Sequence, residues 1–133
     1  MIQLYIDENI SPFLAQGLHY LEKGNGNEIA VLSIKDVFGN GALDEDWIPK
    51  IGEVGGIVIT QDFNIFRKKQ QKDLYEKCGV GLFFIRPPSK RGYRYWEMVE
   101  QIVYRWVEIK ELSRSRPPFA YECTAKGKFV RLS

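Results

Sequence analysis

The sequence predicts an α/β fold: a three-layer α/β/α sandwich around a central, mainly parallel sheet, with a C-terminal β-hairpin as an extension. Strand-like apolar runs alternate with helical segments through most of the chain, which is typical of a parallel sheet with helices on both faces. The chain has 133 residues, 44% of them hydrophobic, which suits one domain with a real core. We therefore expect a single domain over residues 1–133, with a core of about 1–113 and the hairpin extension at about 117–133.

Short apolar runs predict the strands of this sheet. The buried parallel strands are expected at residues 2–6, 29–32, 57–60 and 81–85. Two later runs, 119–123 and 128–132, flank a turn at Ala125-Lys126-Gly127 and predict the terminal hairpin.

Capping residues and helical spacing predict the helices. The first should begin at Ser11-Pro12, because serine caps free N–H groups and proline suits the first helical turn. It should run to about residue 22, and a loop is expected at 37–43, which holds two glycines. Further helices are expected from residue 44 to the Gly55-Gly56 break, from 63 to about 77, and from 93 to about 113. The last has an apolar stripe that we expect to be core: Trp96, Val99, Ile102, Val103 and Trp106.

Three acidic motifs stand where this fold would bring carboxylates together. Asp7-Glu8-Asn9 follows the first strand, Asp44-Glu45-Asp46 opens a helix, and Thr60-Gln61-Asp62-Phe63-Asn64 ends the third strand. Ligands of open parallel sheets bind beyond the carboxyl ends of the strands, so these side chains should face one crevice. Carboxylates held close together repel and need a cation or protons, and hard oxygen ligands suit Mg²⁺ or Mn²⁺. The pattern therefore predicts a metal-dependent enzyme.

Each motif also has a purely structural interpretation. Acids in a first helical turn complement the helix dipole, which would account for Asp44 without any catalytic role. Asp7 could serve only to cap the helix that follows, and Asp62 only as a turn residue between a strand and a helix. A hydrogen bond from Thr60 could in turn hold Asp62. The three motifs together, in this strand context, favour a site.

The two halves of the chain carry opposite charge. Residues 1–66 hold three basic and ten acidic residues, a net of 3 − 10 = −7, and residues 67–133 hold sixteen basic and seven acidic residues, a net of 16 − 7 = +9. A basic half beside an acidic metal pocket is what a nuclease needs, since the metal acts on one phosphate while the basic surface holds the strand. Solvated helix faces would give the same charge blocks without any nucleic acid.

Other classes of protein fit poorly. The two cysteines, Cys78 and Cys123, are too far apart for a zinc-type pair and do not make a disulfide scaffold, which suits a reducing cytoplasm. No apolar run approaches the ~20 residues that cross a bilayer, and no basic leader precedes the first strand. We expect a cytoplasmic protein that does not bind a membrane.

The ordered set of motifs resembles a compact PIN-like domain, similar to the short group related to VapC-type toxins. Leu4 to Asn9, Asp44 to Ile48 and Ile57 to Asn64 carry the resemblance, which covers roughly residues 2–90. It implies an Mg²⁺- or Mn²⁺-dependent endoribonuclease, of the kind that acts as the toxin of a toxin–antitoxin pair. RNA and an antitoxin protein are then the expected partners, and a homodimer is left open.

The resemblance also implies roles for particular residues. Asp7, Asp44 and Asp62 would be catalytic and would hold the metal, with Glu45 as the alternative second acid. The fourth acidic position of the family is Asn64 here, an amide that would lower the charge of the site and weaken a second metal. Hydrolysis would follow from a metal-bound water of lowered pKa. Phosphate contacts are expected from basic residues after the third and fourth strands: Arg67, Lys68, Lys69, Arg91 and Arg94.

Two other functions stay open from the sequence. Phosphoryl transfer to an aspartate, as in receiver or haloacid-dehalogenase-like domains, uses acids at similar strand ends. A receiver would want a lysine ending a later strand, whereas Ile85 is followed by Arg86-Pro87-Pro88. The main alternative is a non-catalytic module on a PIN-like fold that binds nucleic acid or protein.

Overall fold

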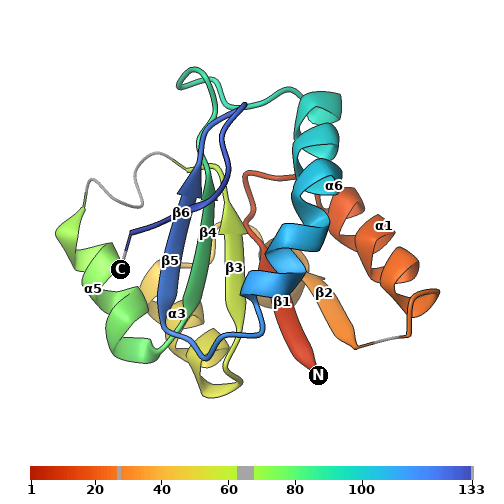
Figure 1. Ribbon diagram of the computed structural model, residues 1–133. Helices are drawn as coiled ribbons and strands as arrows, with labels where there is room; N and C mark the ends of the chain where they lie inside the picture. Colours follow the sequence, from red (N-terminus) through yellow and green to blue (C-terminus); the bar gives the residue numbers. More distant parts are fainter. Residues whose placement is uncertain (27, 63–67, 133) are drawn as a thin grey trace.

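A single sheet organises the molecule, and the computed structural model describes it over residues 1–26, 28–62 and 68–132. The strands are β1 (Ile2–Ile6), β2 (Ile29–Ser33), β3 (Ile57–Thr60), β4 (Gly81–Ile85), β5 (Phe119–Cys123) and β6 (Val130–Arg131). Their order in the sheet is β2-β1-β3-β4-β5-β6, and every pair is parallel except β5 with β6 (Figure 1). The predicted fold class is confirmed.

The terminal hairpin is present and is also part of the central sheet. β6 pairs with β5 in antiparallel register, as the turn at 125–127 predicts. However, β5 also lies parallel to β4 over its whole length, from Gly81 opposite Phe119 to Ile85 opposite Cys123. The region predicted as an extension therefore contributes the fifth parallel strand.

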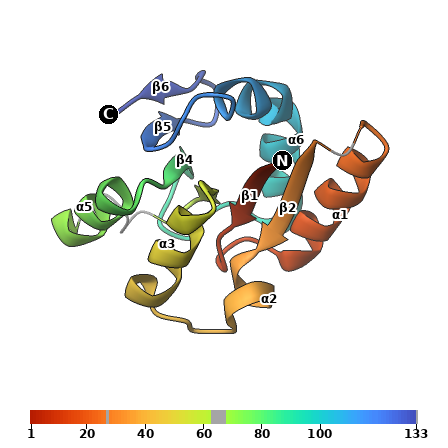
Figure 2. The same ribbon diagram turned by 90° about the horizontal axis from the view of Figure 1, so that it is seen from below.

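Helices cover both faces of the sheet. α1 (Pro12–Lys23) and α6 (Tyr95–Leu112) lie on one face, while α2 (Ile34–Phe38), α3 (Asp44–Glu53) and α5 (Lys69–Cys78) lie on the other (Figure 2). No helix in the described ranges is long and apolar enough to cross a membrane.

The core is correspondingly split into two clusters by the sheet. On the α1 and α6 face, Leu14 and Leu18 meet Ile102 and Trp106 over β1, β3 and β4. On the other face, the buried side chains from the helices are Ile34, Trp47, Ile48, Ile51 and Tyr75. Strand residues point alternately into the two clusters, so the central strands are apolar throughout.

The start of α1 follows its predicted capping. Ser11 is the N-cap, its Oγ accepts a hydrogen bond from the Phe13 amide at 3.1 Å, and Pro12 fills the first helical position. This capping brings the chain out of β1, through Asp7 and Asn9, and directly into a helix. The acidic residue at the end of β1 is thereby held at the carboxyl edge of the sheet.

One helix was not expected from the sequence. A one-turn helix, α2, occupies Ile34–Phe38, so its last residues lie where only a loop was predicted; Ser33 caps it and Ile34 is 1% exposed. Five residues are too few to display a helical period. α5 begins at Lys69, and residues 63–67 of the predicted helix lie outside the described residues.

The predicted apolar stripe of α6 is only partly buried. Ile102 and Trp106 are buried, but Trp96 is 71% exposed and Val103 is 54% exposed. The buried stripe of α6 runs instead through Met98, Ile102, Trp106 and Ile109. Trp96 therefore belongs to the surface at the beginning of the helix.

Candidate active site

The acidic motifs meet at the point where the strand order reverses. β1 and β3 are neighbours in the sheet, but the connection from β1 to β2 carries α1 on one face, and the connection from β3 to β4 carries α5 on the other. Such a switch point leaves a crevice beyond the carboxyl ends of the two strands. Asp7 leaves β1 and Asp62 leaves β3 at this crevice, and the Asp7 amide donates to the Ile59 carbonyl at 3.0 Å.

One small cavity collects the predicted acids. Its volume is about 100 Å³. Three elements supply the carboxylates: Asp7 after β1, Asp44 at the start of α3 and Asp62 after β3. Among the described residues, the lining is Asp7, Glu8, Asn9, Asp44, Trp47, Asp62 and Tyr75. Three aspartates that lie 18 to 55 positions apart in the chain are therefore brought to one place by the sheet and by α3.

Asp7 is the most enclosed of these carboxylates. It is 8% exposed, its Oδ2 accepts a hydrogen bond from Thr60 Oγ1 at 2.6 Å, and its Oδ1 accepts one from the Glu8 amide at 2.8 Å. Burial raises the pKa of the Asp7 carboxyl to about 6, and the negative charges of Asp62 and Asp44 push it in the same direction. The two hydrogen bonds act against this rise. A carboxylate in this state gains strongly from a nearby cation.

Thr60 joins the two strand ends. It is fully buried, donates its hydroxyl to Asp7 and accepts a hydrogen bond from the Asp62 amide at 3.0 Å. The expected hydrogen bond between Thr60 and Asp62 is confirmed, through the backbone of Asp62. One hydroxyl therefore fixes both the side chain after β1 and the backbone after β3.

Asp44 does more than begin a helix. Leu43 is the N-cap residue of α3, and Asp44 Oδ2 accepts a hydrogen bond from Gln71 Nε2 of α5. Burial raises the pKa of the Asp44 carboxyl, and the charges of Asp62, Glu45 and Glu8 raise it further. Its raised pKa and its place in the cavity distinguish it from an ordinary first-turn acid.

The other predicted site residues that the structure describes do not line this cavity. Glu45 is exposed and lines, with Asp44 and Lys68, a neighbouring cavity of about 320 Å³. Lys69, Arg91 and Arg94 are exposed, Lys69 at the start of α5 and the arginines in the connection from β4 to α6. Asn64 and Arg67 lie outside the described residues.

Tyr75 is a site residue that the sequence did not reveal. It is the one buried residue of α5 in an otherwise polar helix, so no periodic pattern marks it. Its ring packs edge-on against Trp47 with centroids 6.2 Å apart. Its hydroxyl is buried without a hydrogen-bond partner among the described residues. Burial, together with the charges of the three aspartates, raises the pKa of Tyr75 well above its ordinary value, so the phenol stays a neutral donor.

The residues present fit a hydrated hard cation. In the described parts of the chain, no group of three or more His, Cys, Asp or Glu side chains is close enough to enclose a metal ion directly. The cavity nevertheless offers carboxylate oxygens whose mutual repulsion a cation would relieve, and a phenol that has no hydrogen-bond partner in the described part of the chain. Mg²⁺ keeps several of its waters in protein sites, so it does not need a complete set of protein ligands.

Comparison with known proteins identifies the family. A family model described as a PIN like domain matches residues 2–87, which span β1 to the end of β4 and contain all three acidic motifs. Neither the curated proteins nor the solved structures contain a match. The match covers well over half of the chain and agrees with the α/β/α architecture, so the protein belongs to the PIN-like domain family.

Proposed function

We propose that this protein is a metal-dependent endoribonuclease that hydrolyses RNA phosphodiester bonds. One observation carries the proposal: Asp7, Asp44 and Asp62 line one cavity at the switch point of the sheet. The charge of Asp62 raises the pKa of both Asp7 and Asp44, as expected of a site built for a cation. PIN-like domains are commonly nucleases that depend on a divalent metal, which supports the same chemistry.

Asp7, Asp44 and Asp62 would hold Mg²⁺ or Mn²⁺. When bound, such an ion lowers the pKa of a coordinated water and stabilises negative charge on the leaving oxygen. Thr60 keeps the Asp7 carboxylate oriented toward the cavity through its 2.6 Å hydrogen bond. Gln71 does the same for Asp44 from α5. The Tyr75 hydroxyl is available to donate to a phosphate oxygen, because nothing in the described structure accepts its proton.

Basic residues at the same edge would hold the rest of the strand. Lys68 and Lys69 stand at the start of α5, and Arg91 and Arg94 stand between β4 and α6. Both segments follow the carboxyl ends of strands and so lie on the side of the sheet where the cavity opens. Cationic side chains here would bind phosphates independently of base sequence.

Cleavage of RNA by the purified chain tests the proposal. A mixed pool of single-stranded and structured RNAs is incubated with Mg²⁺ or Mn²⁺, with EDTA, and with the Asp62→Asn variant. Mn²⁺ binding is followed separately by the shift in thermal unfolding. Asp73→Asn is the matched control, because Asp73 is an exposed aspartate of α5 that lines none of the cavities described.

The two readouts separate the alternatives. Cleavage that EDTA and Asp62→Asn abolish, and that Asp73→Asn leaves intact, is the expected result. Mn²⁺ binding without cleavage of any RNA in the pool would contradict the ribonuclease activity while keeping the metal site. RNA binding with neither metal binding nor cleavage would favour the non-catalytic binding module instead.

We also propose, from the resemblance to VapC-type toxins, that the nuclease is the toxin of a toxin–antitoxin pair. Induced expression should then arrest growth of the host cell, and Asp62→Asn should not. Growth arrest that persists in the Asp62→Asn variant would show that toxicity does not depend on the acidic cavity.

A further inference from the structure

A second cavity adjoins the acidic one. It has a volume of about 230 Å³ and lies between the start of α1, the end of β3 and the start of α6. Its walls are aromatic and aliphatic, with Tyr93, Tyr95 and Leu14 among them, and its polar groups are Asn9, Ser11 and Gln61. Nothing in the proposed metal chemistry uses this space.

The two cavities are immediate neighbours. Asn9 lines both of them, and Gln61 of the second cavity precedes Asp62 of the first in the chain. The two cavities therefore share a wall at Asn9 and at the Gln61–Asp62 backbone. Adjoining cavities of this kind suit a phosphate and the base that one sugar joins to it.

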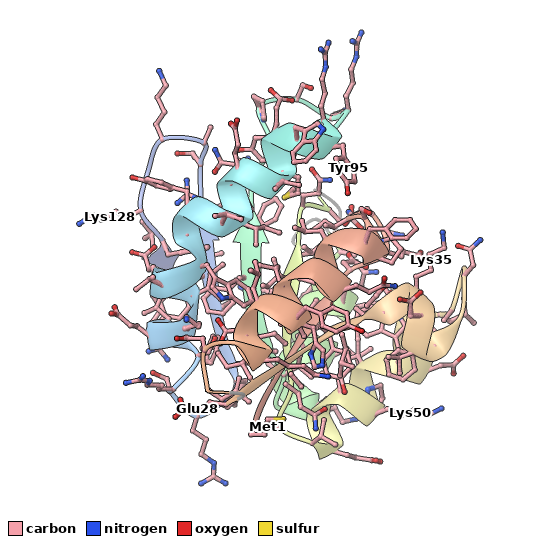
Figure 3. All side chains as sticks on the ribbon, turned by 90° about the vertical axis from the view of Figure 1, so that its right-hand side faces the viewer. Met1, Glu28, Lys35, Lys50, Tyr95 and Lys128 are labelled. Carbon is pink, nitrogen blue, oxygen red and sulfur yellow. The ribbon has the colours of Figure 1, made fainter. Side chains whose placement is uncertain are left out.

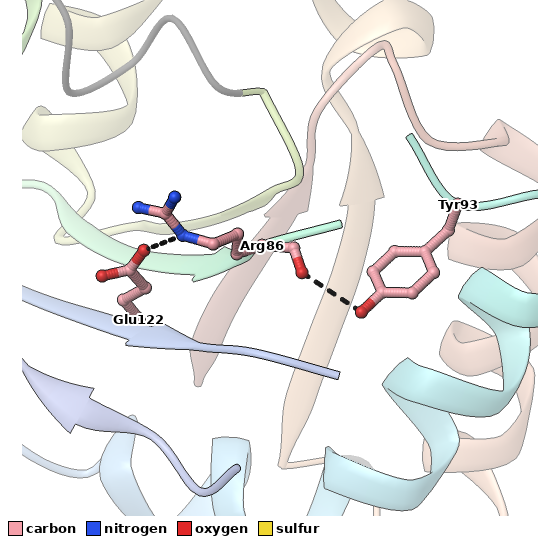
Figure 4. A network of polar contacts seen from close by, with 3 residues as sticks. All are labelled: Arg86, Tyr93 and Glu122. Atoms are coloured by element: carbon pink, nitrogen blue, oxygen red, sulfur yellow. Dashed lines mark hydrogen bonds and ion pairs between the residues drawn. The ribbon is translucent and has the colours of Figure 1, made fainter. Parts of the chain in front are cut away.

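Hydrogen bonds hold the walls of the second cavity in place. Gln61 Nε2 donates to the Asn9 carbonyl at 3.0 Å, and Gln61 Oε1 accepts from the Tyr93 amide at 2.7 Å. Gly92 permits this close approach, because a Cβ there would stand 2.9 Å from Gln61 Oε1, and its φ of +79° also favours glycine. The Tyr93 hydroxyl donates to the Arg86 carbonyl at 3.2 Å, as Figure 4 shows. The cavity is thus preformed rather than assembled on binding.

Tyr95 lines this cavity, and the exposed ring of Trp96 contacts it from outside. Tyr95 is 50% exposed and Trp96 is 71% exposed, and their rings meet edge-on with centroids 5.5 Å apart. Figure 3 places Tyr95 at the end of α6 that lies next to the start of α1. Two large aromatic side chains left in water beside a preformed cavity are typical of a surface on which a flat ring stacks.

We propose that this cavity, called here the base pocket, binds one unstacked nucleobase of the RNA whose phosphodiester occupies the acidic cavity. The proposal rests on the proposed function for the identity of the ligand. The Tyr95 ring would stack on the face of the base, and the polar groups of Asn9 and Ser11 would meet its edge. A base inside a duplex is stacked and cannot enter, so the pocket selects single strands, loops or bulges.

The chemistry of the surroundings favours a nucleobase over an aromatic side chain of a protein. Lys90, Arg91 and Arg94 lie in the loop that leads into the pocket wall, where a nucleic acid backbone would pass. The volume of about 230 Å³ lies below that of pockets for larger ligands, which run from about 300 to 1,000 Å³. One ring system beside one phosphate accounts for both cavities.

Binding measured without cleavage tests the base pocket. Fluorescence anisotropy with Ca²⁺ in place of Mg²⁺, with the RNA checked to be intact afterwards, compares a labelled seven-nucleotide single-stranded RNA, the same RNA in a duplex, and a series with one abasic nucleotide at each position. The variants are Tyr95→Leu, which removes the ring, and Tyr95→Phe, which keeps it. Tyr104→Leu is the matched control, since Tyr104 is an 84% exposed tyrosine on the same helix that does not line the pocket.

The expected result is specific to one base and one ring. Tyr95→Leu should weaken binding of the single strand by about 5- to 150-fold, which corresponds to the range measured for losing one base–aromatic stack. Tyr95→Phe and Tyr104→Leu should stay within about twofold of the wild type. One abasic position should cause the same loss as Tyr95→Leu, and combining the two should add nothing.

The outcomes distinguish this inference from the proposed function. Cleavage by the wild type together with unchanged binding by Tyr95→Leu would overturn the base pocket and leave the nuclease intact. Tyr95-dependent binding without cleavage would support the base pocket and contradict the nuclease activity. Because Tyr95 is half exposed, its variants should fold, and Val99→Phe offers a second check by filling the cavity from its α6 wall, with the same loss of affinity expected.

Discussion

The buried carboxyl group of Asp7 affects the stability of the metal-free protein. Its pKa is raised from an ordinary 3.8 to about 6 by burial first and by Asp62 and Asp44 next. The folded protein therefore binds this proton more tightly than the unfolded chain does. The proton bound by Asp7 therefore stabilises the fold in full below about pH 4, and this stabilisation is lost as the pH rises through about 6. At neutral pH the ionised group costs on the order of 3 kcal/mol.

Asp7→Asn should therefore stabilise the metal-free protein, and only at the higher pH. Thermal unfolding in EDTA should show a higher midpoint for the variant at pH 7.5, with the difference shrinking toward pH 4.5. The same variant should lose the stabilisation by Mn²⁺ that the wild type shows. A difference between variant and wild type that does not change with pH would show that Asp7 titrates normally in the folded state.

Thr60 acts on the site only through the groups that it holds. Thr60→Val keeps the shape of this fully buried side chain and removes both the donor to Asp7 and the acceptor for the Asp62 amide. Loss of a residue that orients a metal ligand typically costs 10–100-fold in metal affinity or activity. We expect Mn²⁺ affinity, measured by calorimetry, to fall by about that factor in Thr60→Val. Thr60→Ser retains the hydroxyl and should stay close to the wild type.

The acids of the helix start provide an internal comparison. Asp44 lines the acidic cavity and accepts a hydrogen bond from Gln71, whereas Asp46 in the same turn is exposed. Both complement the helix dipole, so any effect of that kind should be shared. Asp44→Asn should reduce RNA cleavage by at least about tenfold, whereas Asp46→Asn should not change it. Equal activities in the two variants would return Asp44 to a structural role.

Among the helices and strands, the strands were predicted from the sequence almost residue for residue. Strand runs such as 2–6 and 81–85 are short, apolar and bounded by turn residues, so composition alone marks both their type and their ends. α2 was missed because one helical turn has no period to detect. Trp96 was wrongly assigned to the core because residues 96, 99, 103 and 106 fit helical spacing as well as the true buried stripe does. Only the packing of α6 against the sheet decides which stripe is buried.

Contacts between distant elements explain what the sequence could not show of the site. The three aspartates were identified because each follows a strand or opens a helix. Tyr75 and Gln71 lie in the middle of a polar helix, and they reach the site only because α5 packs beside α3. Gln61 was given no role of its own from the sequence, although its side chain connects two loops. Such roles depend on tertiary contacts that leave no local pattern.

Arg105 connects α6 to the β5–β6 turn through hydrogen bonds. It is 3% exposed, and its guanidinium donates to the carbonyls of Thr124 and Gly127, both at 2.6 Å, and to Gln101 Oε1 at 2.9 Å. Arg105→Met removes these bonds and should lower the free energy of unfolding by about 2 kcal/mol. Arg105→Lys keeps the charge but not the forked geometry and should recover only part of the loss.

Denaturant unfolding measures the total effect, and hydrogen exchange locates it. Amides of β6 and of the turn at 124–129 should lose protection in Arg105→Met more than amides of β1 and β3 do. Uniform loss of protection across the sheet would mean that Arg105 supports the whole fold rather than this one contact.

At the scale of the whole molecule, charge is divided between the acidic first half and the basic second half. The sheet topology brings parts of both halves to one edge of the sheet. All connections that follow strands β1, β3 and β4 emerge at the same edge, so the acidic cavity and the basic segments at 68–69 and 86–94 share that edge. Other basic residues, such as Arg114 and Arg116, lie between α6 and β5 at the opposite edge. The sum of charges in each half does not reveal this division.

The salt dependence of RNA binding should distinguish the two edges. Each phosphate contact to a single strand contributes about 0.7 to the slope of log affinity against log salt. Replacing both Arg91 and Arg94 by Gln should therefore reduce the magnitude of that slope by about 1.4, if each contacts one phosphate. Replacing Arg114 and Arg116 by Gln changes the net charge equally but at the far edge, so the slope should remain that of the wild type. Anisotropy titrations in EDTA over a range of KCl concentrations give both slopes. Equal reductions in the two double variants would mean that the overall charge attracts RNA, and that the carboxyl edge is not its particular binding surface.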